Sequence, residues 1–149
     1  MNYISDHDLE MEYRNRFTIS EGMIVSDSKT AAKHIISVIG SRMTERECFV
    51  VMLLSGRNQL IDSKVLFEGT ITATAVYPRE IVKLALEENA AAIIIGHNHP
   101  SGNLNASADD RKITDKIRKA LSTVDINLHD HIIVVPGGGY TSFADKGLM

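Results

Sequence analysis

The sequence has one cysteine, no long apolar run and no excess of basic residues. Because Cys48 is the only cysteine, the chain can form neither an internal disulfide nor a cysteine-rich zinc module. The longest apolar run, AAAIIIG, is much shorter than the roughly 20 residues that span a bilayer. The first residues, MNYISDHDLEMEYRNRF, are acidic and polar where a signal peptide is basic and then apolar. We therefore expect a cytoplasmic protein without a membrane span.

Length and composition indicate one folded domain. The chain has 149 residues, of which 44% are hydrophobic and 23% are charged, as is usual for globular proteins. Its 16 basic and 19 acidic residues give a net charge of -3, so no global positive field would attract nucleic acid. Nucleic-acid binding would need a local basic patch. We divide the chain into an N-terminal arm, 1–20, and one domain, 21–149.

Hydrophobic periodicity predicts alternating helices and strands. Apolar residues spaced by three and four indicate helices, and short apolar runs between turn residues indicate buried strands. Residues 60–70 and 71–78 are rich in Val, Ile and Thr and predict a hairpin or meander. The predicted order begins with a helix from a Ser28 cap to about 40, a central strand at 47–56 and the two β-rich pieces. A helix from Pro78, a strand at 91–100, a helix from Ser107, and a closing strand, glycine turn and short strand follow. This order describes an α/β or α+β layered domain.

Two histidines and an aspartate surround a loop in the stretch GHNHPSGNLNASADD, residues 96–110. In a strand, residues i and i+2 point to the same face, so His97 and His99 would project together while Asn98 points away. Gly and Asn in the following loop permit a tight reversal, and a helix starting at Ser107 would bring Asp110 back toward both rings. Imidazole and carboxylate are both zinc ligands. The pattern therefore predicts a metal site.

Each of these residues also has an ordinary structural explanation. Ser107 and Asp110 have nearly the spacing of a capping box, in which the acid only satisfies backbone N–H groups. Two histidines at a strand end can occur by chance. The site hypothesis explains all these residues together, whereas the ordinary explanation must treat each one separately. The His-x-His-x-Asp-His pattern of other metallohydrolases does not fit, because Ser101 and Gly102 occupy its last two positions.

The segment HNHPSG, followed by Ser107 and Asp110, resembles the JAMM (MPN+) metalloprotease signature. With LFEGTITATAVYPREIVKLALEENAAAIIIGHNHPSG and the ending DHIIV and SFADKGLM, the chain resembles the RadC family of JAB-domain proteins over residues 20–149. The resemblance implies a JAB/MPN-like fold, with a cytidine-deaminase-like mixed β-sheet flanked by helices. RadC proteins usually carry an N-terminal helix-hairpin-helix segment, and this chain resembles the short forms associated with mobile elements.

The resemblance implies one zinc ion held by His97, His99 and Asp110, with water in the fourth position. Three protein ligands and an open position are typical of catalytic zinc, which lowers the pKa of bound water to about 7. The signature also places a glutamate near the start of an earlier strand as the base, and Glu47 matches this position. Glu45 is the alternative, since it would share the strand face of Glu47. Ser107 would donate a hydrogen bond to the developing oxyanion.

The expected function is zinc-dependent cleavage of a peptide or isopeptide bond, with a peptide or protein as substrate. The alternative is a nucleic-acid-associated accessory or interaction module, of the DNA-repair type, with a structural or vestigial zinc. Three further features have simpler explanations. His129 and His131 form a second same-face pair, which we interpret as strand residues or an outer contact of the site. Cys48 is expected in the core, and the basic residues of the helix after the site are expected in solvent.

Overall fold

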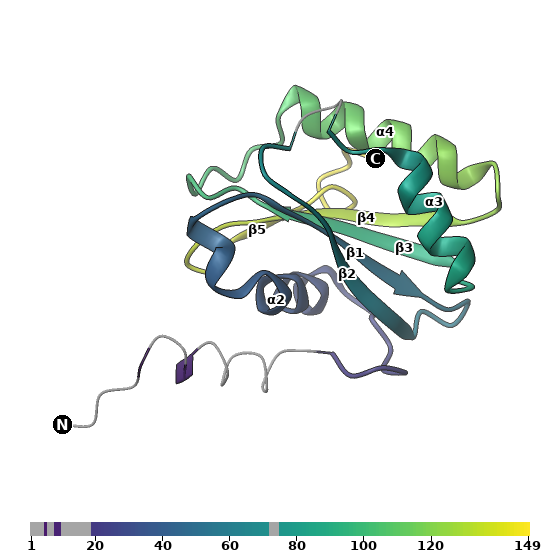
Figure 1. Ribbon diagram of the computed structural model, residues 1–149, viewed down its shortest axis with the longest axis horizontal. Helices are drawn as coiled ribbons and strands as arrows, with labels where there is room; N and C mark the ends of the chain where they lie inside the picture. Colours follow the sequence, from purple (N-terminus) through teal and green to yellow (C-terminus); the bar gives the residue numbers. More distant parts are fainter. Residues whose placement is uncertain (1–4, 6–7, 10–18, 72–74) are drawn as a thin grey trace.

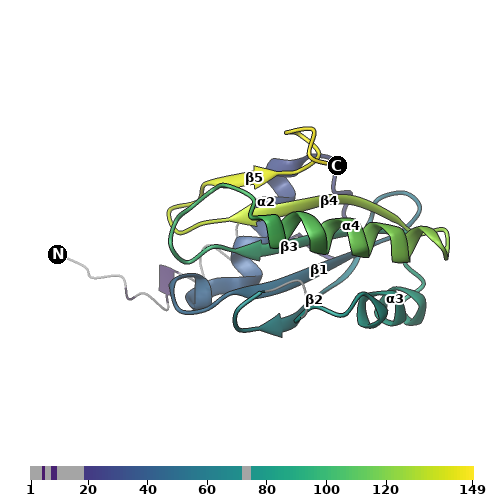
Figure 2. The same ribbon diagram turned by 90° about the horizontal axis from the view of Figure 1, so that it is seen from above.

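The computed structural model describes residues 5, 8–9, 19–71 and 75–149 (Figure 1). Most of the expected N-terminal arm, 1–20, and residues 72–74 of the second β-rich piece lie outside the described residues. The remainder is one β-sheet with helices on both faces (Figures 1 and 2). The predicted α/β layered fold and mixed sheet are therefore confirmed.

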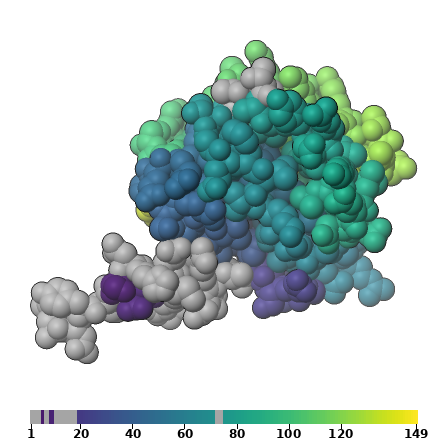
Figure 3. All heavy atoms as spheres, viewed as in Figure 1, coloured from purple at the N-terminus to yellow at the C-terminus, as the bar shows by residue number. Residues whose placement is uncertain are grey.

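The sheet has five strands in the order β2-β1-β3-β4-β5. The strands are β1 Cys48–Leu54, β2 Leu60–Glu68, β3 Ala92–Asn98, β4 Asn127–Val134 and β5 Tyr140–Ser142. Only β3 and β4 run parallel, and the other neighbouring strands are antiparallel. Every residue of β1 and β3 is buried, as expected for strands covered on both faces. The edge strand β2 and helix α3, in teal, make up much of the face seen in Figure 3.

Helix α2, Ser28–Ile39, covers one face of the sheet and continues into the short 3-10 helix η1, Gly40–Thr44. Helices α3, Pro78–Glu87, and α4, Ala108–Ser122, cover the other face (Figure 1). Alternate residues of β1 and β3 therefore pack into two separate hydrophobic cores, one against α2 and one against α3 and α4. None of the helices in the described part of the chain could cross a bilayer.

Two local predictions were wrong. The cap of α2 is Asp27 rather than Ser28, because the Asp27 carboxylate accepts a hydrogen bond of 2.6 Å from Thr30 N. Strand β2 pairs with β1 and not with the second β-rich piece, whose described residues 71 and 75–77 lie outside any strand. Strand propensity alone does not specify a pairing partner, because pairing also depends on which elements cover each face.

A close approach between α2 and β3 fixes the sheet next to the histidines. A Cβ atom on Gly96 would lie 2.5 Å from Cδ1 of Ile35, so the helix could not pack here against a larger residue. Ile35 is fully buried in this contact. Because Gly96 immediately precedes His97, the same contact positions the end of β3 that carries the first histidine.

A buried histidine joins the start of the domain to both α2 and the sheet. His34 is 2% exposed, and its Nδ1 accepts a hydrogen bond of 3.0 Å from Ile19 N. The neutral ring therefore carries its hydrogen on Nε2, which lies 2.6 Å from Ser63 Oγ on β2. Burial lowers the pKa of His34 from its ordinary value of 6.5 to about 4.

We expect this histidine to make the metal-free protein sensitive to acid. Above pH 6.5 the ring is neutral in both states and its full contribution to stability is present. As the pH falls to about 4, only the unfolded chain takes up the proton, which costs about 3 kcal/mol of unfolding free energy. Urea unfolding across this pH range, with chelator present, should show a shallower pH dependence in His34→Gln. The exposed control His129→Gln should match the wild type, and equal slopes in His34→Gln and wild type would disprove the assignment.

Candidate metal centre

The chain reverses direction between β3 and α4, as the sequence predicts. Gly102 N donates to His99 O at 3.0 Å, and Gly102 has a φ of 85°, which favours glycine. The remaining loop is braced by its own side chains, since Asn105 N donates to Asn103 Oδ1 at 2.9 Å. This reversal places the start of α4 beside the end of β3.

Ser107 and Asp110 form a complete capping box at the start of α4. Asp110 N donates to Ser107 Oγ at 3.0 Å, and Ser107 N donates to Asp110 Oδ2 at 2.8 Å. The ordinary explanation of this pair is therefore correct. It does not compete with a role as a metal ligand, because the capping bonds hold the Asp110 carboxylate in a fixed position facing the histidines.

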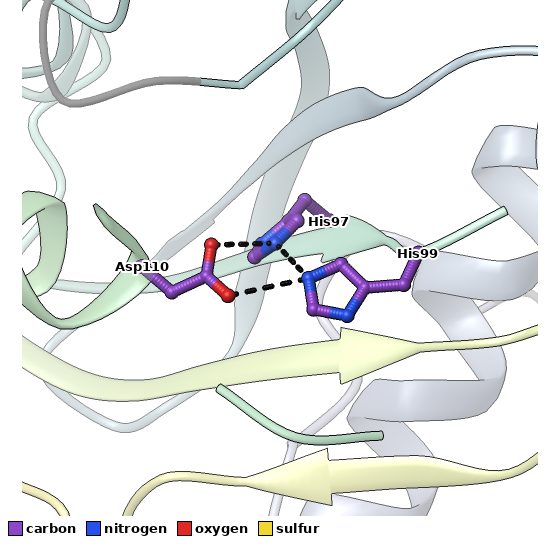
Figure 4. A group of neighbouring side chains, drawn as sticks. All are labelled: His97, His99 and Asp110. Atoms are coloured by element: carbon purple, nitrogen blue, oxygen red, sulfur yellow. Dashed lines mark hydrogen bonds and ion pairs between the residues drawn. The ribbon is translucent and has the colours of Figure 1, made fainter. Parts of the chain in front are cut away.

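The predicted ligands converge (Figure 4). His97 Nε2 lies 3.1 Å from Asp110 Oδ1, and His99 Nε2 lies 3.2 Å from Asp110 Oδ2. The two Nε2 atoms are 3.0 Å apart. One ligand atom from each residue falls within 4.8 Å of the others, so the group could hold a metal ion. His97 and Asp110 are almost fully buried, whereas the His99 side chain is 13% exposed and forms the solvent side of the group.

Hydrogen bonding fixes the hydrogen of His99 on the nitrogen away from the group. His99 Nδ1 lies 2.6 Å from Asn103 O, and since a carbonyl oxygen only accepts, Nδ1 must carry the hydrogen. In the neutral ring, Nε2 then directs a lone pair at the Asp110 carboxylate, which also only accepts. Two acceptors at this distance repel each other unless a cation or a proton lies between them. The site is therefore suited to positive charge.

The charges at the site are strongly coupled. Burial acts to raise the pKa of Asp110, but hydrogen bonds from the His97 and His99 rings, in the forms that carry a hydrogen on Nε2, outweigh it and hold that pKa well below its usual range. The hydrogen bond with Asp110 raises the pKa of His99 against the effect of burial, and the negative charge of Glu47 acts in the same direction. Asp110 is therefore ionised at neutral pH, as a carboxylate ligand must be.

The donor atoms are of the kinds that zinc binds, and they lie close together. Zinc binds nitrogen and oxygen at about 2.0 to 2.2 Å, which places tetrahedral ligand atoms about 3.3 Å apart. The two Nε2 atoms are 3.0 Å apart and lie 3.1 and 3.2 Å from different oxygens of Asp110, and one ligand atom from each residue lies within 4.8 Å of the others. Two imidazoles and one carboxylate also leave one position open, as in catalytic zinc sites. The donor set of these residues therefore fits zinc.

Glu47 lies beside this group, immediately before β1. In the register of β1 and β3, Phe49 is opposite His97, and continuing it by one pleat places Glu47 opposite His99. The Glu47 carboxylate accepts a hydrogen bond from Ile71 N. An open pocket beside Glu47 is lined by Glu45, Arg46, Glu47, Gly69, Thr70 and Pro100.

Glu45 does not share the strand face of Glu47, contrary to the sequence argument for it as the alternative. It caps the end of η1 in a helical backbone conformation, so strand alternation does not apply to it. Its exposed carboxylate lies 3.5 Å from Arg46 Nη2. Although Glu45 lines the same pocket, Glu47 directly precedes the strand that pairs with β3, and its charge acts on His99.

Sequence reasoning missed the part played by Asn98, between the two histidines. Its side chain is fully buried on the opposite face of β3 from His97. Asn98 Oδ1 accepts from Cys48 N at 2.7 Å, while Nδ2 donates to Met43 O and Arg46 O, each at 2.8 Å. The amide therefore forms hydrogen bonds with the backbone on both sides of Glu47. An amide residue between the two histidines, at the end of a fully buried strand, was the available signal.

The predicted same-face pair of His129 and His131 does not form. Ile93 pairs with Leu128 and Ile94 with Asp130, so His129 is the extra residue of a β-bulge. His129 is exposed and bonded to Asn58, whereas His131 is fully buried with Nε2 2.8 Å from His97 Nδ1. The outer contact considered for this pair therefore exists for His131 alone.

Cys48 and the basic residues of α4 lie where the sequence predicts. Cys48 is fully buried in the core beneath α2, and burial raises the pKa of its thiol. Arg118 and Lys119 are exposed and both form ion pairs with Asp115, at 3.0 and 2.9 Å. These charges form a solvated helix face.

Comparisons with known proteins identify the family of this chain. Residues 25–148 match the RadC-like JAB domain family. A "UPF0758 protein" of Vibrio cholerae is 42% identical over 99% of this chain and 90% of its own length. Proteins of the same name from Chromobacterium violaceum and Pseudoalteromonas translucida are 44% and 52% identical, over 60% and 48% of their lengths. The chain thus spans about half to three-fifths of these two longer relatives. By both the domain match and these identities, this chain belongs to the RadC-like JAB-domain family.

Proposed function

We propose that the protein is a zinc-dependent metallohydrolase that cleaves an amide bond, in a peptide or an isopeptide linkage. The observation that carries the proposal is the convergence of His97, His99 and Asp110, whose nearest ligand atoms lie 3.0 to 3.2 Å apart. The family match to a JAB domain supports the same class of chemistry. These three residues would hold the zinc ion.

The roles of the remaining residues follow from their positions. A bound zinc ion would polarise the reacting groups and lower the pKa of a bound water to about 7. Glu47, on the neighbouring strand end, would accept the proton of the attacking water and pass it to the leaving amine. Ser107 Oγ accepts from Asp110 N, so its own hydrogen is not used in that bond. Because Ser107 is exposed, it would donate that hydrogen to the carbonyl oxygen of the substrate.

Zinc content and chelation test the proposal directly. The purified protein should contain one zinc ion per chain by elemental analysis, and anomalous scattering should place it between the three ligands. A panel of peptides and isopeptide-linked peptides should include a substrate whose cleavage stops with chelator and returns with zinc. A folded protein that takes up no zinc, or cleavage that chelation leaves unchanged, would refute the proposal.

DNA binding by the purified protein distinguishes the proposed enzyme from the alternative, an accessory nucleic-acid module. Such a module should bind DNA with the steep salt dependence of phosphate contacts. His97→Ala should leave that binding intact, whereas it should abolish zinc-dependent cleavage. Steep salt-dependent binding together with no cleavage across the panel would favour the module.

A further inference from the structure

A buried chain of hydrogen bonds leads from the ligand ring of His97 to the helix that carries Asp110. His97 Nδ1 lies 2.8 Å from His131 Nε2, and His131 Nδ1 lies 2.5 Å from Thr114 Oγ1. Thr114 Oγ1 in turn lies 2.7 Å from Asp110 O, one helical turn earlier. His131 is fully buried and Thr114 is 3% exposed, so bulk water does not compete for these bonds.

The direction of every bond in this chain follows from its last member. Asp110 O is a carbonyl oxygen and can only accept, so the single hydroxyl hydrogen of Thr114 points to it. Thr114 Oγ1 must then accept from His131, which places the hydrogen of that ring on Nδ1. The neutral ring of His131 consequently offers a lone pair at Nε2.

The hydrogen position on the ligand ring of His97 follows in the same way. Because His131 Nε2 accepts, His97 Nδ1 must donate, and the neutral His97 ring carries no hydrogen on Nε2. Nε2 is the atom that lies 3.1 Å from Asp110 Oδ1 and 3.0 Å from His99 Nε2. The lone pair of His97 is therefore directed into the ligand group before any ion arrives.

We propose that His131 and Thr114 are positioning residues that fix the hydrogen of His97 on Nδ1 and so keep its Nε2 free for a metal ion. This inference rests on the proposed metal site. Metal-bound histidines usually donate their other N–H to a carboxylate, a backbone carbonyl or water. Here the acceptor is a second imidazole, whose own tautomer is set by a threonine on the helix of another ligand.

Ring packing holds His131 in place for this role. The ring of Phe143 stacks on His131, with centroids 4.5 Å apart and an interplanar angle of 24°. Phe49 contacts His131 edge-on at 6.3 Å and also stacks on His97 at 6.4 Å. Because Phe143 covers one face of the buried ring and Phe49 meets it edge-on, His131 cannot turn to offer a different atom to His97 without moving its neighbours.

Thr114→Val tests the proposal with little change in side-chain shape. Without the hydroxyl, Nδ1–H of His131 loses its acceptor, so the ring should shift its hydrogen to Nε2 and donate to His97. His97 would then carry its hydrogen on Nε2, the atom that must bind the ion. Zinc affinity, measured by competition with a chromophoric chelator, should fall by about 10- to 100-fold, the usual cost of losing an outer partner of a metal ligand.

Matched variants make the result specific. Thr114→Ser keeps the hydroxyl and should restore an affinity close to wild type. Thr123→Val is the control, because Thr123 makes the same kind of bond, to Ala120 O at 2.6 Å, in an exposed position at the end of α4. It should leave zinc affinity unchanged. His131→Gln, which can still present an acceptor to His97, provides a second variant if Thr114→Val does not fold.

A tautomer measurement distinguishes positioning from packing. In metal-free protein at mildly alkaline pH, long-range nitrogen–proton NMR should show His97 with hydrogen on Nδ1 in wild type and on Nε2 in Thr114→Val. Unchanged tautomers would overturn the proposal, even if affinity falls. If the wild type binds no zinc, the proposed function fails, and this comparison still decides the assignment of His131 and Thr114.

Discussion

Replacing Glu47 by Gln should reduce turnover of the amide substrate by about 10²- to 10⁴-fold, the usual contribution of a general base. Gln has nearly the same shape, and its carbonyl oxygen can still accept the hydrogen bond from Ile71 N. It cannot take up a proton from water. Zinc should therefore remain bound while kcat falls, as measured by steady-state kinetics together with zinc content.

Glu45→Gln is the matched control for this prediction. Glu45 lines the same pocket and carries the same charge, but its carboxylate faces Arg46 at the end of η1. Its replacement should change kcat by less than a few fold. A large loss in Glu45→Gln with an active Glu47→Gln would exchange the two assignments, and full activity of both variants would remove the general base from the mechanism.

The second large effect is expected from His99→Ala, which should weaken zinc binding by about 10²- to 10³-fold. Four-ligand zinc sites bind with roughly 10 to 16 kcal/mol, or about 2.5 to 4 kcal/mol for each ligand. His99 is the most exposed of the three ligands, so truncating it disturbs the core least. Isothermal titration with zinc measures the loss.

Thermal unfolding gives an independent readout of the same variant. Zinc at about 100 times its dissociation constant should stabilise the wild type by about 2.7 kcal/mol, and at the same concentration His99→Ala should lose most of that increment. His129→Ala is the control, because His129 is an exposed histidine bonded only to an Asn side chain in the described residues. If zinc stabilises His99→Ala as much as wild type, His99 is not a ligand.

The sequence was sufficient to predict features that depend on short-range spacing. His97 and His99 are two residues apart on a strand end, and Ser107 and Asp110 have the spacing of a helix start. Both patterns hold wherever the strand and the helix lie, so the layered fold and the converging ligands followed from local rules. The choice of Glu47 depended on the resemblance to a metalloprotease signature.

Features that depend on the register between distant strands could not be predicted. The bulge at His129 turns His131 toward His97, and no local pattern reveals that extra residue. Thr114 lies one turn after Asp110, but its role depends on where β4 is placed beside β3. The pairing of β2 with β1 was missed for the same reason, since the sequence shows strands without their partners.

The amide of Asn98 links the strand end that carries the histidines to the segment that carries Glu47. It binds the backbone on both sides of Glu47, so the spacing between the histidines and that carboxylate is set across two strands and not within one loop. Transplanting the segment 96–110 onto another sheet would carry all three ligands but would not include Glu47. A working graft would need residues 43–48 as well, held at the same register.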